Sequence, residues 1–346
     1  MKALILAGGK GTRLRPLTVF TPKPIVPVVN RPFLLYQIEI LQRAGIKEIT
    51  LSLSYQPDKI EAVLNDCDEL GVDVRFITEP SPMGTGGAYR FAADTDHETT
   101  VVFNGDILTD IDLKKMISLH QKRKSSATIA LVPVDDPSRY GLVEVGKNGE
   151  VLRFVEKPRP EELASLRINT INAGIYILEP LILNLIPKGE NRSFEYNVFP
   201  SILEKRIPFF SYVMDGEYWR DIGTPDSYLA AHRDLVDGAI RGFDIDRTAR
   251  ADVATAAQVD KLSVLGEGCV IKPNAQIVNS ILGPGVHVEE KAVIENSVIW
   301  SHTRISNFAE VKGSIIGRSC HIGRNAMVGV GTVLGDKASL PDYSKV

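Results

Sequence analysis

A six-residue period near the C-terminal end constrains the fold of this chain more than any other feature of its sequence. Four aliphatic residues stand six positions apart, each followed by a glycine: Ile316, Ile322, Val328 and Leu334. This repeat is typical of a parallel β-helix, in which each coil buries its apolar face against its neighbours. The pattern is looser upstream and breaks at Pro284 and near Phe308. It predicts a short β-helix over residues 263–346, with about four coils of roughly 18 residues.

Residues 1–235 follow a different pattern, in which short apolar runs alternate with longer amphipathic stretches. The runs predict buried strands at residues 3–7, 48–54, 73–77, 99–103 and 127–133. Apolar residues at helical spacing predict helices at 33–45 and 112–124. This alternation favours a Rossmann-like, doubly wound and mostly parallel α/β sheet, with ligands at the carboxyl ends of its strands. The irregular, alanine-rich residues 236–262 are expected to form a linker between the two domains.

The composition limits the possible partners. The chain has 40 Lys and Arg against 43 Asp and Glu, a formal net charge of −3, and 44% apolar residues. This is the balance of an ordinary globular protein, so we expect no nucleic-acid partner and only local clusters of positive charge. Cys67, Cys269 and Cys320 lack metal-ligand spacing and are expected to be reduced. The first apolar run is too short for a signal peptide or a membrane span, which predicts a cytoplasmic protein with no membrane partner.

A glycine-rich loop follows the first predicted strand, at residues 8–11. Backbone N–H groups in such a loop can approach phosphate oxygens closely. The loop fits neither the Walker A motif nor the dinucleotide fingerprint, because Arg13 and the prolines after it contradict both patterns. A triphosphate is still a suitable ligand, since Arg13 offers a planar fork of donors and Lys23, between two prolines, offers a point charge. The structural alternatives are a tight turn for the glycines and solvated surface charges for Arg13 and Lys23.

Two aspartates are candidate metal ligands. Asp106 follows the apolar run at 101–103, and Asp221 lies in the segment YWRDIGTP that begins at Tyr218. Catalytic groups are expected at the ends of strands in a doubly wound sheet. Two carboxylates from distant segments suit Mg²⁺, which takes few protein oxygens and fills its shell with water and substrate phosphates. The alternative is structural: Asp106 as a turn residue, and Asp221 as the N-cap of a helix that begins near Pro225.

The string GGKGTRLRPLT at residues 8–18 resembles the signature of the sugar-nucleotide pyrophosphorylases, and the resemblance extends along the whole chain. It implies a nucleotidyltransferase domain followed by a left-handed β-helix, and a reaction that joins a nucleoside triphosphate to a sugar 1-phosphate and releases pyrophosphate. It implies catalytic roles for Arg13, Lys23, Asp106 and Asp221, with Mg²⁺ held by the two aspartates. GTP and mannose 1-phosphate are the favoured substrates. The alternatives are thymidylyl or uridylyl transfer to glucose 1-phosphate and guanylyl transfer to heptose 1-phosphate.

The nucleotide is expected to bind at the glycine loop and at a second loop of small residues, 79–88. The residues expected to contact it are Ala7, Gly8, Gly9, Gly11, Thr12, Arg13, Lys23, Glu79, Gly84, Thr85, Gly86, Gly87 and Asn104. Small side chains in the second loop allow a flat purine to lie against the backbone. Thymidylyl and uridylyl relatives tend to have Gln near the position that matches Gly87, so its absence favours guanine.

The same resemblance assigns the acceptor sugar phosphate to residues farther along the chain. The implied contacts are Tyr140, Gly141, Glu156, Lys157, Asn172, Gly174, Arg192 and Glu195. Similar proteins use the matching Glu156 for sugar hydroxyls and the matching Lys157 for the sugar phosphate. Asn172 and Gly174 come just before a strand predicted at 175–178. The structural alternatives are an exposed ion pair for Glu156 with Lys157 and a strand-edge turn for Asn172.

Two other functions remain open at this point. The β-helix is also a fold of acyltransferases, and His287, His302 or His321 could serve as a base there, although surface or turn positions are the simpler interpretation. The chain could also be a non-catalytic regulatory subunit that binds a sugar nucleotide, but such a subunit is expected to lose a metal carboxylate or the signature Arg and Lys. We therefore expect an enzyme whose β-helix contributes to a homo-oligomer.

Overall fold

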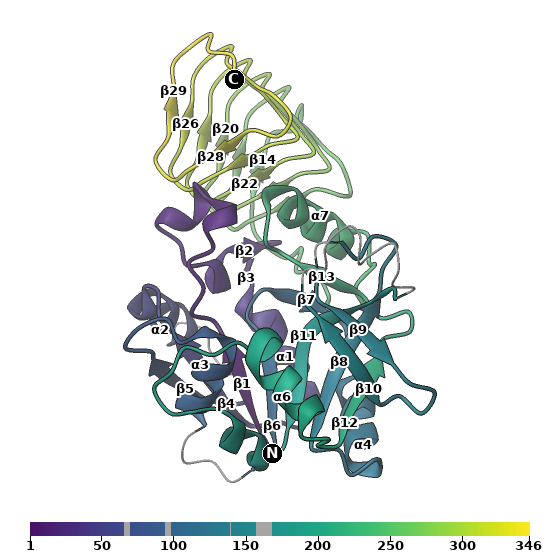
Figure 1. Ribbon diagram of the computed structural model, residues 1–346. Helices are drawn as coiled ribbons and strands as arrows, with labels where there is room; N and C mark the ends of the chain where they lie inside the picture. The colour runs from purple at the N-terminus through teal and green to yellow at the C-terminus, as the bar shows by residue number, and fades with distance from the viewer. Residues whose placement is uncertain (66–69, 94–97, 139, 157–167) are drawn as a thin grey trace. The chain divides into compact units, whose positions relative to one another are not determined.

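The computed structural model describes residues 1–65, 70–93, 98–138, 140–156 and 168–346 (Figure 1). Its contacts divide the chain into two compact units. The first unit consists of residues 1–9 and 34–219, and the second unit consists of residues 10–33 and 220–346. Each unit therefore combines two separate stretches of the sequence.

The first unit is built on one large sheet. Its strands are β1 (Lys2–Leu6), β4 (Glu48–Leu53), β5 (Asp73–Thr78), β6 (Thr100–Asn104), β8 (Ala127–Pro133), β9 (Leu142–Val145), β10 (Val151–Val155), β11 (Thr170–Leu178) and β12 (Phe209–Val213). The order is β10-β9-β11-β6-β1-β4-β5, with β8 beside β11 and β12 beside β8. Strands β6, β1, β4 and β5 are parallel, whereas β11 runs antiparallel to β6, β8 and β9. The α/β sheet is confirmed. In the half around β11, β9 and β10 are also antiparallel, whereas β8 and β12 are parallel.

Helices and short turns connect these strands. They are α1 (Leu34–Arg43), α2 (Pro57–Asn65), α3 (Gly84–Ala92), α4 (Leu113–Lys122), α6 (Phe199–Glu204), the 3-10 helix η4 (Pro180–Leu185) and the π-helical turn η5 (Phe194–Val198), with the short strand β7 (Ile107–Thr109). Helices α1 and α4 confirm the two predicted helices. Helix α4 begins after Asp112, because the Asp112 carboxylate caps it by accepting a hydrogen bond from the Lys115 amide at 2.9 Å.

Strand β11 differs from its prediction in a way that concerns the site. It begins at Thr170, so Asn172 and Gly174 lie inside it instead of before it. Its register with β8 shifts between Asn172 and Tyr176, and Gly174 has a φ of 72°. A non-glycine residue is strained at this angle, and bulges of this kind are common beside active sites. The glycine interrupts the apolar pattern, which is why the sequence places the strand too late.

An aromatic core holds the elements behind this bulge together. The rings of Phe194 and Phe199 are stacked with centroids 5.5 Å apart. Both contact the ring of Tyr176, at 5.1 and 5.2 Å. All three side chains are buried, so they pack η5 and α6 against β11 and stabilise that arrangement.

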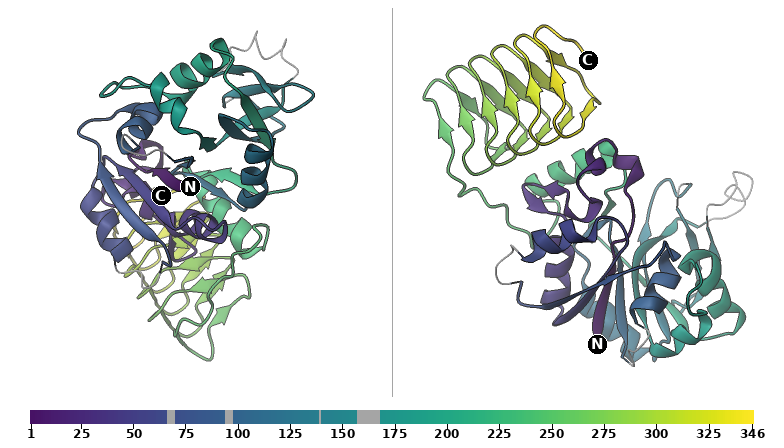
Figure 2. Two further views of the ribbon diagram at one scale, coloured as in Figure 1. Left: turned by 90° about the horizontal axis from the view of Figure 1, so that it is seen from below. Right: turned by 90° about the vertical axis from the view of Figure 1, so that its left-hand side faces the viewer.

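The second unit contains a left-handed parallel β-helix whose coils stack as the right-hand view of Figure 2 shows. Its strands are β14 (Asp252–Val253), β15 (Gln258–Val259), β16 (Val264–Leu265), β17 (Val270–Ile271), β18 (Gln276–Val278), β19 (Ile281–Leu282), β20 (His287–Val288), β21 (Val293–Glu295), β22 (Val298–Ile299), β23 (Arg304–Ile305), β24 (Glu310–Lys312), β25 (Ile315–Ile316), β26 (His321–Ile322), β27 (Met327–Val328), β28 (Val333–Leu334) and β29 (Ser339–Leu340). They form three parallel sheets of six, five and five strands. Pairing continues past Pro284 and Phe308, because both lie in turns between strands.

The β-helix begins earlier than the hexapeptide pattern indicates. Strands β14 and β15 lie within the predicted linker at 236–262, and they pair with β17 and β18. The largest sheet therefore has six strands, where about four coils were predicted. The first coil escapes detection because both residues of β14 are exposed, Val253 by 41%, and Gln258 of β15 is exposed as well, so no apolar period marks it.

The remaining elements of the second unit are short. They are the 3-10 helices η1 (Thr12–Leu14), η2 (Leu17–Val19) and η3 (Lys23–Ile25), the antiparallel pair β2 (Pro27–Val28) and β3 (Arg31–Pro32), most of β13 (Trp219–Asp221), and helix α7 (Pro225–Val236). Residues 10–33 thus carry no long helix or strand. Their position depends on contacts with the rest of the unit.

The cysteines of the β-helix are structural. Cys269 and Cys320 are buried free thiols, as predicted, and burial raises the pKa of each thiol. Cys67 lies outside the described residues.

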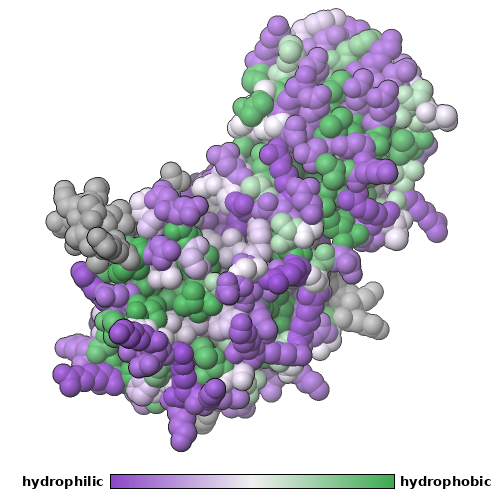
Figure 3. Space-filling model, turned by 90° about the vertical axis from the view of Figure 1, so that its right-hand side faces the viewer, coloured by the Kyte–Doolittle hydropathy of each residue, from purple (hydrophilic) through white to green (hydrophobic). Residues whose placement is uncertain are grey.

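Polar and apolar side chains intermix on the face of the β-helix visible in Figure 3. Within the described part of the chain, no helix is long and apolar enough to cross a membrane.

Candidate functional site

The glycine loop begins in the first unit, where β1 ends at a tightly packed backbone. A Cβ atom at Gly8 would lie 2.8 Å from Ser54 Oγ and 3.0 Å from Glu79 Oε1, so a larger residue would have to displace one of these side chains. The Ser54 hydroxyl donates to the Gly8 carbonyl at 2.5 Å. Ala7 is buried, whereas Gly9 is exposed and a Cβ there would meet no described atom within 4 Å. The loop is thus fixed at Gly8 and open at Gly9.

Glu79 connects this loop to the second loop of the predicted nucleotide site. Its buried carboxylate accepts hydrogen bonds from Ser52 Oγ at 2.9 Å and from the Met83 amide at 3.1 Å. Met83 precedes α3, so Glu79 ties the start of that helix to the end of β4. Glu79 and Gly8 thus lie side by side. Contact of either residue with the nucleotide stays a prediction.

The glycines at the start of α3 have a packing role. Gly84 has a φ of 70°, and a Cβ at Gly87 would lie 2.5 Å from the Glu190 carbonyl oxygen. The Gly87 amide donates to the Arg192 carbonyl at 2.9 Å. Gly86 is also buried, and a Cβ there would lie 3.0 Å from Val198 Cγ2 and 3.2 Å from the Arg192 carbonyl oxygen. These packing contacts account for the small residues even with no nucleobase bound. Binding of guanine at this loop therefore stays a prediction.

The second half of the glycine loop lies in the second unit. Gly11 has a left-handed φ of 61°, and its carbonyl accepts a hydrogen bond from Thr18 Oγ1 at 2.7 Å. A Cβ at Gly11 would lie 3.0 Å from the Cβ of Lys23. Thr12 and Arg13 follow on an exposed turn, whereas Lys23 is only 7% exposed. Lysines are rarely buried, so the burial of Lys23 argues against the alternative that it is a solvated surface charge.

Gly223 brings two predicted catalytic residues of the second unit together. A Cβ at Gly223 would lie 2.7 Å from Arg13 Nη2 and 2.8 Å from Asp221 Oδ2. The guanidinium and the carboxylate therefore share the space above this glycine. The alternative role of Asp221 as an N-cap is wrong, because Thr224 caps α7 by accepting from the Ser227 amide at 3.3 Å. Gly223 was not predicted as a site residue.

Several predicted sugar-binding residues gather around Tyr176 in the first unit. Asn172 Nδ2 donates to the Tyr176 hydroxyl at 2.9 Å, and Asn172 Oδ1 accepts from the Gly174 amide at 2.9 Å. Burial raises the pKa of Tyr176 well above its usual value. The negative charges of Glu195 and Glu156 add to this rise in pKa, and hydrogen bonds from Asn172 and Asn104 oppose it. We name these residues, with Tyr176 at their centre, the Tyr176 cluster.

Asn104 and Glu195 complete the Tyr176 cluster. A Cβ at Gly174 would lie 2.7 Å from Asn104 Nδ2. Asn104 Oδ1 is buried and has no hydrogen-bond partner among the described residues. Glu195 Oε2 accepts from Thr85 Oγ1 at 3.1 Å, which links the cluster to the start of α3.

Tyr140 and Gly141 lie beside this cluster. The Asn172 amide donates to the Gly141 carbonyl at 3.0 Å, and a Cβ at Gly141 would overlap Glu156 Oε2. The Tyr140 ring packs edge-on against Trp219 with centroids 5.7 Å apart. The Trp219 indole donates to the Ala173 carbonyl at 2.8 Å. Tyr176 and Trp219 were not predicted as site residues.

Other predicted residues are not brought into the cluster. The Arg192 guanidinium pairs with Glu190, at 3.0 and 2.6 Å, on a partly exposed surface. Lys157 lies outside the described residues. Asp106 lies half-buried in the turn between β6 and β7 of the first unit, whereas Asp221 belongs to the second unit. Among the described residues, no group of three or more His, Cys, Asp or Glu could hold a metal ion.

Two family models match this chain. Residues 2–238 match the model described as nucleotidyl transferase. Residues 245–346 match the model of the EIF2B subunit epsilon LbH domain. Together they cover both the α/β sheet and the β-helix.

Curated relatives align over most of the chain. The mannose-1-phosphate guanylyltransferase of Mycobacterium tuberculosis is 36% identical over 284 residues, which cover 80% of this chain and 77% of the relative. Mannose-1-phosphate guanylyltransferase 1 of Arabidopsis thaliana is 37% identical, with 80% of this chain and 76% of the relative covered.

Solved structures align with about two thirds of this chain. HddC of Yersinia pseudotuberculosis is 34% identical with a TM-score of 0.59, and the alignment covers 68% of this chain and 99% of HddC. A second structure of HddC, complexed with GMP-PN, is 35% identical with a TM-score of 0.57 and covers the same shares of both chains.

Proposed function

Because the chain belongs to the nucleotidyl transferase family, we propose that it joins GTP to mannose 1-phosphate, giving GDP-mannose and pyrophosphate. The observation that carries the acceptor side of this proposal is the Tyr176 cluster. It places hydrogen-bonding oxygens from Asn104, Glu156, Asn172 and Glu195 around one bulged strand. The buried Asn104 Oδ1, without a partner among the described residues, offers an acceptor for a sugar hydroxyl.

The chemistry requires positioning more than acid–base catalysis. An oxygen of the sugar phosphate attacks the α-phosphorus of GTP, and the bond to the departing pyrophosphate breaks in line with the attack. The phosphate monoester is already ionised near neutral pH, so no general base has to remove a proton. Orientation of the two substrates then supplies much of the rate.

The main obstacle is repulsion between two anions. At 4 Å and an effective dielectric constant near 20, each pair of unit charges contributes about 4 kcal/mol. Arg13 provides a planar fork of donors above Gly223, and the buried Lys23 provides a second positive charge. These charges are of the right size to offset the repulsion.

The carboxylates fit a divalent cation. Asp106 and Asp221 are both half-buried, and their oxygens are the ligands that Mg²⁺ prefers. Two carboxylates are enough for this ion, because water and substrate phosphates complete its coordination shell. Family members of this kind use a divalent metal, and Mg²⁺ is our proposal for this chain. When bound, the ion neutralises charge on the phosphates.

The choice of sugar and base rests on the relatives. The curated relatives are named for mannose 1-phosphate and guanylyl transfer, and HddC was solved with GMP-PN. Lys157 and Arg192 are proposed to bind the sugar phosphate, and Arg192 would then exchange its partner Glu190 for that phosphate. The regulatory alternative is disfavoured, because Arg13, Lys23, Asp106 and Asp221 are all present in the sequence.

A substrate panel tests the proposal. GTP, dTTP, UTP and ATP are each combined with mannose, glucose and heptose 1-phosphates, and pyrophosphate release is measured with Mg²⁺. We expect the GTP and mannose 1-phosphate pair to give the highest kcat/KM. A higher value for dTTP with glucose 1-phosphate would overturn the assignment of base and sugar.

A carboxylate variant tests the metal site. Asp106→Asn should lower turnover on the order of 100-fold or more, because it removes an anionic metal ligand. Asp58→Asn, on the exposed first turn of α2, is the matched control and should leave turnover unchanged. Near-normal activity of Asp106→Asn would remove Asp106 from the metal site.

A further inference from the structure

The segment that carries Arg13 and Lys23 depends on distant contacts for its position. Residues 10–33 contain only three short 3-10 helices and a pair of two-residue strands. The backbone hydrogen bonds within this segment close only short turns and one two-residue strand pair, so contacts from elsewhere must fix its position. This segment forms one compact unit with residues 220–346.

Helix α7 supplies the first anchors of this segment. The Val29 amide donates to His232 Nδ1 at 3.1 Å. The Tyr228 hydroxyl donates to the Pro27 carbonyl. Tyr228 is fully buried, His232 is 2% exposed, and their rings pack edge-on with centroids 4.6 Å apart. The anchored residues, Pro27 and Val29, lie only four and six positions after Lys23 in the sequence.

The β-helix supplies a second set of anchors. Asn30 Nδ2 donates to the carbonyl of Leu282, in strand β19, at 2.9 Å. A Cβ at Gly335, near the last coils, would lie 3.0 Å from the Cβ of Pro16. The segment therefore touches the β-helix at two places, on both sides of Lys23.

A hydrogen-bond relay joins these two sets. The Trp300 indole, on the turn after β22, donates to the Tyr228 hydroxyl at 3.0 Å, and that hydroxyl donates onward to Pro27. Trp300 is 1% exposed, and the Arg318 guanidinium lies over its ring, 5.5 Å from the centroid. Each donor in this relay is buried, so breaking one bond leaves a polar group without its partner.

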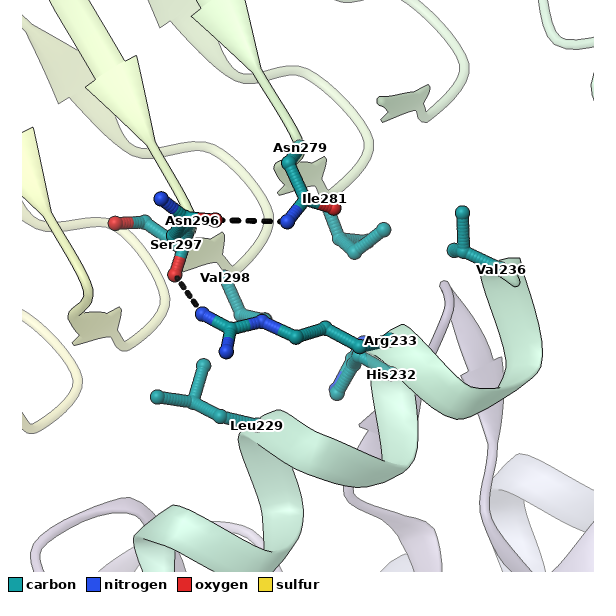
Figure 4. A pocket seen from close by; sticks show the side chains of 9 residues that line it. All are labelled: Leu229, His232, Arg233, Val236, Asn279, Ile281, Asn296, Ser297 and Val298. Carbon is teal, nitrogen blue, oxygen red and sulfur yellow. Dashed lines mark hydrogen bonds between the residues drawn. The ribbon is translucent and has the colours of Figure 1, made fainter. Parts of the chain in front are cut away.

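Helix α7 is itself held against the β-helix. Figure 4 shows Arg233 donating to the Asn296 carbonyl, at 3.5 Å, and Asn279 donating to Asn296 Oδ1, at 2.7 Å. Leu229 and His232 of α7 line the same small pocket as these asparagines. The helix is thus a fixed support between the β-helix and residues 27–30.

We propose that Tyr228 and Trp300 are positioning residues for the nucleotide, and that the β-helix acts through their relay to hold the Lys23 segment in its binding conformation. This inference rests on the proposed function, since it assigns Lys23 to the triphosphate. It gives the β-helix a role within one chain, separate from assembly. Both side chains are buried, so we expect them to act through residues 16–30 and not by touching the substrates.

Tyrosine and tryptophan variants of the full chain test the relay. Tyr228→Phe removes both bonds of the hydroxyl and keeps the ring. We expect it to raise KM for GTP about fivefold, because only the bond to Pro27 holds the segment directly and one net hydrogen bond has about this effect. KM for mannose 1-phosphate should stay unchanged. Trp300→Phe keeps the bond to Pro27 and should raise KM for GTP less. Tyr343→Phe, 63% exposed on the last turn, is the matched control.

The double variant and amide exchange separate positioning from simple loss of stability. Tyr228→Phe with Trp300→Phe should raise KM for GTP no more than Tyr228→Phe alone, because both changes break the same relay. Hydrogen exchange of residues 17–33 should be faster in Tyr228→Phe, and this readout is independent of turnover. An unchanged exchange rate, or an equal rise of both KM values, would overturn the proposal. If the wild-type chain turned over no substrate pair, the proposed function would fail while the exchange experiment still decided the relay.

Discussion

Gly223 places a cation and an anion of the proposed site in one small space. The positions of Arg13 Nη2 and Asp221 Oδ2, both under 3 Å from a Cβ at this glycine, leave no room for a side chain. The φ of Gly223 lies outside the left-handed range, so the backbone itself accepts other residues. The steric conflict is therefore with two functional side chains and not with the fold.

The first prediction follows from this geometry. Gly223→Ala should leave the melting temperature nearly unchanged, because the ends of Arg13 and Asp221 can move aside. That movement displaces two groups that must meet phosphate and metal, so kcat/KM should fall on the order of 10–100-fold. Pyrophosphate release and thermal unfolding measure the two effects. A variant with wild-type kcat/KM would show that these two positions do not matter for turnover.

Tyr176 and Trp219 were not predicted as site residues, and one physical reason applies to both. Tyr176 lies in an apolar run and reads as a core residue, which it also is, with its hydroxyl at the edge of the core. Trp219 precedes Asp221 by two positions and reads as part of a strand. Asn172, Gly174 and Glu156 were predictable only through a family motif. Burial of a hydroxyl next to carboxylates depends on the tertiary fold, and no local pattern encodes it.

Serines stack inside the β-helix as a ladder. The amides of Ser280, Ser297 and Ser314 each donate to the hydroxyl of the serine 17 positions earlier, at 3.1 Å. Each hydroxyl donates in turn to a carbonyl two residues before it. The ladder therefore satisfies one buried N–H per coil.

The second prediction concerns this ladder. Ser297→Ala removes the acceptor of the buried Ser314 amide, so it should destabilise the β-helix by about 1–3 kcal/mol. Ser339→Ala, an exposed serine of β29, is the control and should change stability by less than about 0.5 kcal/mol. Urea unfolding of both variants measures the difference. Equal stabilities of the two variants would contradict a structural role of the ladder.

Helix α7 introduces a dependence of stability on pH. Burial lowers the pKa of His232 from 6.5 to about 3, against a hydrogen bond with the backbone of Pro27 that raises it. Below pH 6.5 the unfolded chain takes up a proton on this residue and the folded chain does not. Stability that is fully present above pH 6.5 is therefore lost progressively as the pH falls toward 3.

The third prediction isolates this contribution. His232→Asn keeps an acceptor for the Val29 amide and removes the titrating group. Between pH 7 and pH 5, the wild-type chain should lose about 2 kcal/mol more stability than this variant. His321→Asn, at an exposed position on β26, is the control and should keep the wild-type pH dependence. Urea unfolding followed by tryptophan fluorescence measures the slope, and parallel slopes for all three chains would exclude His232 as the source.

The chain as a whole is interleaved. It passes from the first unit to the second after Gly9, returns at Leu34, and leaves again after Trp219. The alternation of strands and helices and the six-residue period are local patterns. Each predicted the architecture of the region in which it occurs. The assignment of residues 10–33 depends on contacts across more than 200 positions, such as Val29 with His232 and Asn30 with Leu282. Local periodicity carries no information about such contacts.

The last prediction follows from the interleaving. A fragment of residues 1–238 keeps every strand of the nine-stranded sheet but loses Leu282, Trp300 and Gly335, which hold residues 16–30. We expect this fragment to retain the circular dichroism of the sheet, to exchange the amides of residues 17–33 faster than the full chain, and to bind GTP at least about tenfold more weakly. Light scattering identifies aggregation of the fragment and also shows whether the full chain forms the predicted homo-oligomer. A soluble fragment that bound GTP as tightly as the full chain would show that the nucleotide segment holds its conformation without the β-helix.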